Sequence, residues 1–200
     1  TPSVMVIGVF GGSFNPVHAG HISLAREVVA RKLADKVMMV MSPLNPLKED
    51  PASLIDDYLR MEMLRIACLP YPRLEASDIE LSMPRPSYTI DTLRRLAGSN
   101  PGDSFRLVIG ADNWECFDRW KDYREILRDF HPIVYPREGC AMPGEDSQAT
   151  PMWADLLPVS STMIRQRLIT GEPVNNLLPP AVLDYIRANG LYRRDDPQVI

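Results

Sequence analysis

The stretch from Val4 to Leu33 constrains the fold more than any other part of the chain. Val4–Phe10 is a short apolar run rich in β-branched residues, which predicts a buried strand. This run ends at Gly11 and Gly12, and over Ala19–Leu33 the apolar residues recur at helical spacing. The pattern therefore predicts a strand, a glycine turn and a helix. Because adjacent glycines and a helix N-terminus both expose backbone N–H groups, such a unit is suited to bind a phosphate.

Two histidines strengthen the phosphate interpretation. His18 and His21 are three residues apart around the expected helix start, so both side chains can face the same side. Each imidazole can donate a hydrogen bond to a phosphate oxygen, and either can carry charge near neutral pH. Gly20 between them is expected to leave space for a ligand. The alternatives are half of a zinc site or two solvated histidines, but zinc needs further ligands and the three cysteines lack metal-ligand spacing.

Length and composition bound the class of protein. With 200 residues and a 45% hydrophobic fraction, the chain fits one globular domain with a substantial core. The net charge of −4 argues against broad nucleic-acid binding. An odd number of cysteines without metal spacing indicates reduced thiols in a cytoplasm. The N-terminal apolar run is too short to span a membrane, and it is not a signal peptide. We therefore expect a cytoplasmic protein with no membrane or nucleic-acid partner.

The rest of the chain alternates between expected strands and helices. Lys36–Met41 reads as a second buried strand, which completes a β-α-β unit and indicates a parallel sheet. Further strands are expected at Leu74–Leu81 (as a strand or irregular edge segment), Phe105–Gly110, Pro132–Tyr135 and Ala154–Val159, with an exposed loop at Arg137–Pro151. Further helices are expected at Leu54–Ala67, Thr89–Ala97, Tyr123–Asp129, from about Ser160 onward, and within Leu177–Tyr192.

Several polar residues near the ends of these elements have both a functional and a structural interpretation. Lys48 follows the second strand, where ligands bind in open α/β sheets, but it is equally consistent with a solvated lysine. Asp112 is placed either to bind a ribose hydroxyl or to cap a helix. Trp120 is either a core residue or a stacking platform. Hydroxyl side chains at helix starts are candidate N-caps, namely Ser87, Thr89, Ser160 and Ser161.

Three arginines lie on expected helices, and each has either a structural or a functional interpretation. Arg60 and Arg65 are expected to be solvated or paired with neighbouring acids. Arg165 lies three residues after Thr162, so a hydroxyl and a planar cationic fork share one helix face. That pair is a candidate phosphate contact.

Five segments resemble a known family. The segment GGSFNPVHAGH resembles the GGxFxPxHxGH motif of the nucleotidylyltransferase superfamily. The segments PSYTIDTL, IGADNWECFDRWKDYREIL, VSSTMIRQRL and LLPPAVLDYIRANGLY are similar, in the same order, to the nicotinate-nucleotide branch of that superfamily. The resemblance covers most of the chain.

The resemblance implies a fold and an activity. The implied fold is a Rossmann-like three-layer α/β sandwich with a mostly parallel sheet and a small C-terminal helical part. It implies a single domain over residues 1–195, with the helical part at roughly 160–195 and a loose tail at 196–200. The implied reaction is adenylyl transfer from ATP to nicotinate mononucleotide, giving deamido-NAD and pyrophosphate, with Mg²⁺ carried by the ATP phosphates. Whether the protein forms a homo-oligomer is left open.

The resemblance also implies roles for individual residues. The catalytic residues would be His18, His21 and Arg165. The ATP and phosphate contacts would come from Gly11, Gly12, Ser13, Phe14, Ser161, Thr162 and Lys48. The second nucleotide would be bound by Thr89, Gly110, Asp112 and Trp120, with the tryptophan stacked on the pyridine ring.

Two departures from the family pattern and several alternatives stay open. Asn15 stands where some relatives carry Asp, and Leu47 stands where many have a His before the Lys, which weakens the case for Lys48. The alternatives are an adenylyltransferase for nicotinamide mononucleotide or for phosphopantetheine, and a regulatory module that binds nucleotides without catalysis.

Overall fold

The described part of the chain is built around one parallel β-sheet. The computed structural model describes residues 4–44 and 55–193. Within these ranges six strands form a sheet of order β3-β2-β1-β4-β5-β6, in which every neighbouring pair is parallel. The strands are β1 (Val6–Gly12), β2 (Lys36–Met41), β3 (Leu74–Ser77), β4 (Ser104–Gly110), β5 (Ile133–Tyr135) and β6 (Thr150–Pro151). This order is that of the Rossmann fold, so the predicted fold class is confirmed.

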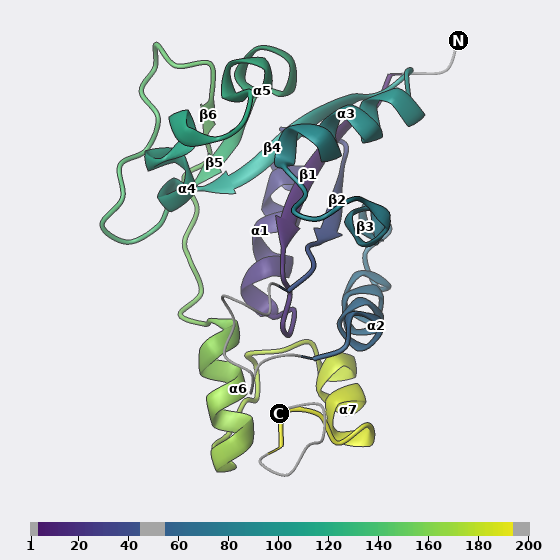
Figure 1. Ribbon diagram of the computed structural model, residues 1–200. Helices are drawn as coiled ribbons and strands as arrows, with labels where there is room; N and C mark the ends of the chain where they lie inside the picture. The colour runs from purple at the N-terminus through teal and green to yellow at the C-terminus, as the bar shows by residue number, and fades with distance from the viewer. Residues whose placement is uncertain (1–3, 45–54, 194–200) are drawn as a thin grey trace.

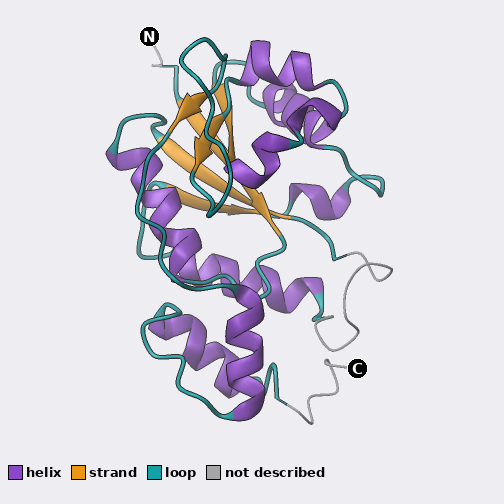
Figure 2. Cartoon of the chain, turned by 90° about the vertical axis from the view of Figure 1, so that its left-hand side faces the viewer, coloured by secondary structure: helices purple, strands orange, loops and turns teal. Residues whose placement is uncertain are grey.

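Helices cover both faces of the sheet (Figures 1 and 2). Buried residues of α1, α2 and α7 belong to one hydrophobic cluster, and those of α3, α4 and α5 belong to a second. The sheet therefore forms the middle of three layers. The helices are α1 (Ala19–Ala30), α2 (Asp57–Cys68), α3 (Thr89–Ser99), α4 (Ala111–Glu115), α5 (Tyr123–Phe130), α6 (Ser161–Thr170) and α7 (Pro180–Ala188), with two 3₁₀ turns, η2 (Ile79–Ser82) and η3 (Phe117–Arg119).

The central strands are apolar on both faces because both faces are covered. In β1, Val9 packs in the second cluster, whereas the next residue, Phe10, packs in the first. Met38 and Met39 alternate in the same way in β2. Since successive side chains of a strand point to opposite faces, a strand buried on both sides reads as a continuous apolar run.

The structure corrects several predicted boundaries. β1 begins at Val6, and Val4 is 66% exposed. The predicted strand at Ala154–Val159 is wrong, since that segment forms no strand or helix. The last strand is instead β6, inside the segment predicted as a loop. Two residues are too short to show an alternating pattern, and β6 is defined by its pairing with β5.

The C-terminal helices lie beyond the carboxyl ends of β1 and β2 (Figure 1). α7 begins with Pro180 in its first turn, and Gly190 follows its C-cap with a φ of 60°. Both positions agree with the prediction, since proline suits a helix start and glycine suits a left-handed conformation after its end. Of the helices that the structure describes, none is long and apolar enough to cross a membrane.

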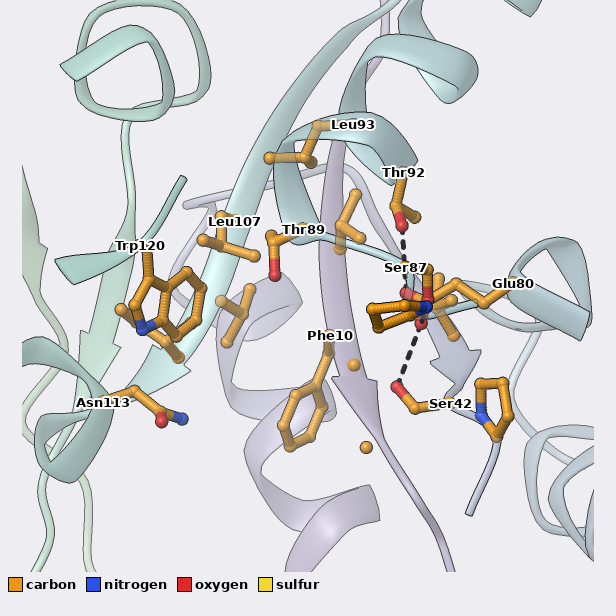
Figure 3. Close-up of a pocket in the computed structure, with 18 of the residues that line it drawn as sticks. Phe10, Ser42, Glu80, Ser87, Thr89, Thr92, Leu93, Leu107, Asn113 and Trp120 are labelled. Atoms are coloured by element: carbon orange, nitrogen blue, oxygen red, sulfur yellow. Dashed lines mark hydrogen bonds between the residues drawn. The ribbon is translucent and has the colours of Figure 1, made fainter. Parts of the chain in front are cut away.

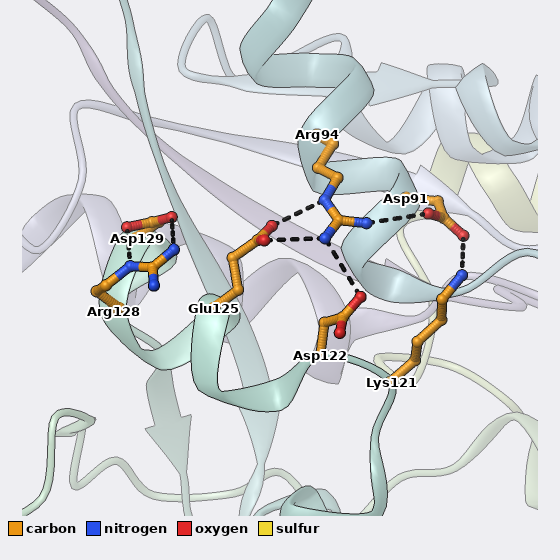
Figure 4. A network of polar contacts seen from close by, with 7 residues as sticks. All are labelled: Asp91, Arg94, Lys121, Asp122, Glu125, Arg128 and Asp129. Atoms are coloured by element: carbon orange, nitrogen blue, oxygen red, sulfur yellow. Dashed lines mark hydrogen bonds and ion pairs between the residues drawn. The ribbon is translucent and has the colours of Figure 1, made fainter.

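An ion-pair network joins α3 to the start of α5 (Figure 4). Arg94 donates hydrogen bonds of 2.8 and 2.9 Å to the two carboxylate oxygens of Glu125 and one of 3.2 Å to Asp122. Lys121 lies 3.5 Å from Asp91, which also pairs with Arg94. The network fixes the segment that follows Trp120 against α3.

Arg60 is buried and pairs with an acid on its own helix, so the solvated alternative of its prediction is wrong and the paired one is confirmed. Its side chain is fully covered, and it forms an ion pair with Asp57. Its Nη1 group donates hydrogen bonds to the backbone oxygens of Ser13, at 2.6 Å, and Ser42, at 3.1 Å. A residue of α2 therefore joins the loop after β1 to the exit of β2. The other arginine of this helix, Arg65, is exposed and pairs with Glu62, as expected.

These two arginines give a matched test of stability. We expect Arg60→Leu to destabilise the protein by about 3 kcal/mol, because two partly buried carbonyl oxygens lose a charged donor and Asp57 loses its buried partner. Arg65→Leu on the same helix should change the free energy of unfolding by less than about 0.5 kcal/mol. Urea unfolding of both variants measures the difference, and equal losses would contradict the structural role of Arg60.

Candidate active site

The two histidines form a reciprocal cap at the start of α1. His18 is the N-cap residue, and its Nδ1 accepts a 3.0 Å hydrogen bond from the backbone N–H of Gly20. The Nδ1 of His21 accepts a 3.0 Å hydrogen bond from the backbone N–H of His18. This arrangement is a capping box, in which residues three apart satisfy each other's free N–H groups. The spacing of the two histidines therefore follows from the geometry of the first helical turn.

The capping bonds determine which ring nitrogen of each histidine carries the proton. Because both Nδ1 atoms accept hydrogen bonds, the neutral rings carry their protons on Nε2. The two rings are stacked, with centroids 3.6 Å apart. His18 and His21 thus place two stacked rings, each with an Nε2–H donor, at the helix start.

The expectation that either histidine carries charge near neutral pH is wrong. Burial, and secondarily the positive charge of Arg137, lowers the pKa of His18 to about 4. Burial, the neighbouring His18 and Arg137 together hold the pKa of His21 well below its usual value. Both rings are therefore neutral at pH 7 and act as hydrogen-bond donors.

The space beside Gly20 is used differently from the prediction. A Cβ atom at Gly20 would lie 2.8 Å from Cε1 of His18 and 3.2 Å from Val159. Glycine is therefore required here because the imidazole of His18 folds back over the helix start and takes part of the space that we assigned to a ligand. Gly20 also lines a small cavity beside the histidines, so part of that space stays open.

The loop between β1 and α1 is held through its backbone carbonyl oxygens. Arg60 binds the oxygen of Ser13. Arg165 of α6 donates a 2.7 Å hydrogen bond to the oxygen of Asn15, and the Ser161 hydroxyl donates one of 2.9 Å to the oxygen of Pro16. Side chains of α2 and α6 thus bind three carbonyl oxygens within the segment Ser13–Pro16, directly after the two glycines that end β1.

The start of α6 agrees in part with its predicted role. Ser160 is the N-cap residue and accepts a 3.1 Å hydrogen bond from the backbone N–H of Met163, so the capping prediction is confirmed. Ser161 instead binds the loop oxygen. Arg165 lies 3.4 Å from the Thr162 hydroxyl, as expected for residues that share a helix face. Phosphate contacts by Ser161, Thr162 and Arg165 stay predictions.

A small cavity brings the histidines and α6 together. It has a volume of about 200 Å³, and its lining residues include His18, His21, Ser160, Ser161 and Arg137. A volume of this size suits a phosphate group. Arg165 lies one helical turn further along and is not among the described residues that line this cavity.

Sequence reasoning missed Arg137, which is the cation facing both histidines. It follows β5 within a segment predicted only as an exposed loop. Its Nε atom lies 3.7 Å from a carboxylate oxygen of Asp112, and its guanidinium lies 5.3 Å from the centre of the Tyr135 ring. A cation just after a predicted parallel strand, at the edge where ligands bind, is the signal that identifies such a residue.

A larger cavity lies at the carboxyl ends of the strands (Figure 3). Its volume is about 700 Å³, and Tyr135 lines both cavities. Of the predicted site residues, Gly11, Gly12, Thr89 and Trp120 line it. The ring of Trp120 is half-buried, with Phe117 packed behind it at 5.1 Å between centroids.

Other predicted site residues have different surroundings. Phe14 is 1% exposed and has a left-handed φ of 46°; its ring packs against His21. Asp112 is exposed and faces Arg137, and the N-cap of its helix is Gly110, so the capping alternative for Asp112 is wrong.

The predictions that Ser87 or Thr89 caps α3 are also wrong, because its N-cap is Tyr88 and no side chain forms the cap bond. Lys48 and Leu47 lie outside the described residues.

The lowered pKa of His18 predicts how stability depends on pH. Between its usual value of 6.5 and its folded value of about 4, the unfolded chain binds more protons than the folded one. This contribution to stability is therefore complete above 6.5 and is lost as the pH falls toward about 4. We expect His18→Asn, which keeps a good N-cap, to lose stability less steeply over this range. Urea unfolding at a series of pH values measures the slopes, and an unchanged slope would count against burial of a neutral imidazole.

Comparison with known proteins identifies the family of this chain. A family model described as cytidylyltransferase-like matches residues 9–167. A protein of Bacteroides fragilis named "Probable nicotinate-nucleotide adenylyltransferase" is 41% identical over 177 residues, 88% of each chain. A protein of the same name from Flavobacterium psychrophilum is 36% identical and covers 95% of this chain and 100% of its own length.

Solved structures agree on the fold. Plasmodium falciparum nicotinic acid mononucleotide adenylyltransferase complexed with NaAD is similar with a TM-score of 0.75 at 18% identity, over 94% of this chain and 97% of that one. The match to the family model and the close similarity to the bacterial relatives lead to one conclusion: this chain belongs to the cytidylyltransferase-like family, among the nicotinate-nucleotide adenylyltransferases.

Proposed function

We propose that this protein transfers the adenylyl group of ATP to nicotinate mononucleotide, giving deamido-NAD and pyrophosphate. The observation that carries the proposal is the pair of adjoining cavities at the carboxyl edge of the sheet. One is lined by His18, His21 and Arg137 and suits phosphate groups, and the other has room for a nucleoside. The names of the bacterial relatives and the NaAD complex of the Plasmodium protein support the same reaction.

The chemistry requires alignment and charge neutralisation more than proton transfer. The phosphate monoester of the mononucleotide has a second pKa of about 6 and is largely a dianion at neutral pH. One of its oxygens attacks the α-phosphorus of ATP and forms a new P–O bond. The bond between the α-phosphorus and the bridging oxygen to the β-phosphate breaks, and pyrophosphate leaves with that electron pair. No proton is removed from the nucleophile, so no general base is needed.

The neutral histidines suit this task. Their Nε2–H groups donate hydrogen bonds to phosphate oxygens, and stabilising charge on the α-phosphate and leaving pyrophosphate lowers the barrier. Arg137 supplies positive charge on the same side. Arg165 fixes the loop through the Asn15 oxygen and is proposed to supply further charge to the triphosphate. The backbone of Gly11, Gly12, Ser13 and Phe14 would contact ATP.

We assign magnesium to the substrate. The described residues contain no group of three or more His, Cys, Asp or Glu side chains placed to hold a metal ion, so a cage made by the protein does not fit them. Mg²⁺ typically keeps several waters and is bound through substrate phosphates. We therefore propose that it arrives with ATP.

The acid form of the pyridine nucleotide is the proposed substrate because the larger cavity offers donors. Thr89 lines this cavity at the first turn of α3, a helix that starts without a side-chain cap. Its hydroxyl and the free N–H groups of that turn suit a carboxylate. Trp120, on another wall, is proposed to stack on the ring (Figure 3).

We treat residues 1–195 as one catalytic unit. Both α6 and the segment after α7 bind the loop between β1 and α1, since Arg165 contacts the Asn15 backbone and the Tyr192 hydroxyl donates a 2.6 Å hydrogen bond to the Asn15 side chain.

The direct test is a pyrophosphate-release assay with ATP and each mononucleotide. We expect kcat/KM for nicotinate mononucleotide to exceed that for nicotinamide mononucleotide by at least about tenfold, the discrimination that a few specific hydrogen bonds provide. Absence of pyrophosphate release with either compound would support a regulatory nucleotide-binding module instead.

Replacement of one histidine tests the catalytic assignment. We expect His21→Ala to lower kcat by about 100-fold or more, the usual loss when one preorganised donor to a developing negative charge is removed. His131, the exposed third histidine at the end of α5, is the control, and His131→Ala should keep kcat within about twofold. A His21→Ala variant that retains wild-type kcat would refute the role given to His21.

A further inference from the structure

Glu80 occupies an unusual position in the wall of the larger cavity. It lies in the 3₁₀ turn η2, between β3 and α3, and it lines the cavity (Figure 3). Three hydroxyl groups donate to its carboxylate. Ser42 and Ser87 reach Oε1 at 3.2 and 3.4 Å, and Thr92 reaches Oε2 at 3.1 Å.

These three donors come from separate parts of the wall. Ser42 follows the end of β2, Ser87 lies in the loop before α3, and Thr92 is in the first turn of α3 and is 2% exposed. An amide has a single acceptor oxygen, whereas a carboxylate offers two oxygens with four lone-pair sites. A carboxylate is therefore the side-chain group suited to collect three hydroxyl donors at one point.

Ser87 and Thr92 lie on either side of Thr89, the residue proposed to bind the carboxylate of the pyridine ring. Ser87 lies two residues before Thr89 and Thr92 lies three residues after it, so Glu80 is bonded to the chain on both sides of Thr89. Thr89 and Thr92 also share a face of α3, because residues three apart on a helix are neighbours.

The contact between Ser42 and Glu80 links the larger cavity to the loop after β1. The backbone oxygen of Ser42 accepts the 3.1 Å hydrogen bond from Arg60, which also binds Ser13 in the phosphate loop. The hydroxyl of Ser42 binds Glu80. The start of α3 is therefore held in a defined position relative to β2 and to the loop that is proposed to contact ATP.

We infer that Glu80 is a positioning residue for the mononucleotide substrate: its carboxylate fixes the start of α3 so that Thr89 and the free N–H groups beside it face the pyridine ring. This inference rests on the proposed function. It assigns Glu80 no contact with the reacting phosphates, so its loss should weaken binding of one substrate and leave the other unaffected.

The test is steady-state kinetics with each substrate varied in turn. We expect Glu80→Ala to raise KM for nicotinate mononucleotide by about tenfold and the isosteric Glu80→Gln by about threefold, as hydrogen bonds to a charged acceptor are lost. KM for ATP and kcat should stay within about twofold of wild type. The matched control is Glu75→Gln, because Glu75 lies on β3, is exposed and pairs with Lys36 away from the cavity.

Variants of the donor test the same contact if Glu80→Ala does not fold. Thr92→Val removes one hydroxyl without changing the side-chain shape and should raise KM for the mononucleotide by about threefold. Thr92→Ser restores the hydroxyl and should restore KM.

The possible outcomes separate this inference from the proposed function. An active wild type whose Glu80 variants keep the mononucleotide KM, or lose affinity equally for both substrates, would overturn the positioning role alone. A lower melting temperature with unchanged kinetics would do the same. A wild type that releases no pyrophosphate would overturn the proposed function, and the inference with it.

Discussion

The loop from Ser13 to Pro16 depends on donors that bind its carbonyl oxygens. A loop that receives a polyanion must turn its N–H groups toward the ligand and its carbonyl oxygens away, because a carbonyl dipole aimed at a phosphate repels it. Those oxygens then need partners inside the protein. Arg60 and Arg165 supply charged donors, and Ser161 supplies a hydroxyl. The sheet, α2 and α6 are thereby arranged around one short piece of backbone.

The two ring nitrogens of each histidine have separate roles. Each ring uses Nδ1 to complete the helix start, and Nε2 carries the proton that is proposed to bind phosphate, so the bonds that stabilise α1 also orient the proposed donors. Burial keeps both rings neutral, and a neutral imidazole loses less hydration than an imidazolium when it is enclosed. The positive charge of the site is therefore carried by arginines, whose guanidinium groups stay protonated in proteins.

Local patterns predicted the elements, but they did not predict contacts between distant parts of the chain. The strand, the turn and the helix that begins at His18 depend on neighbouring residues, and their order predicted the fold class. Arg60 looks like any surface arginine of an amphipathic helix, and its burial is set by carbonyl groups up to 47 residues away. Arg137 and Glu80 acquire their roles in the same way, from partners on other elements, so no spacing rule revealed them.

The bond between Tyr192 and Asn15 joins residues 177 positions apart. Together with the bond from Arg165, which spans 150 positions, it means that the loop between β1 and α1 is held by residues that follow it far along the chain. A nascent chain that still lacks α6 and α7 already has both histidines and Arg60, but it lacks the donors that bind the oxygens of Asn15 and Pro16. The loop between β1 and α1 therefore gains all of its described partners only after α6 and the segment after α7 have been synthesised and have packed against it.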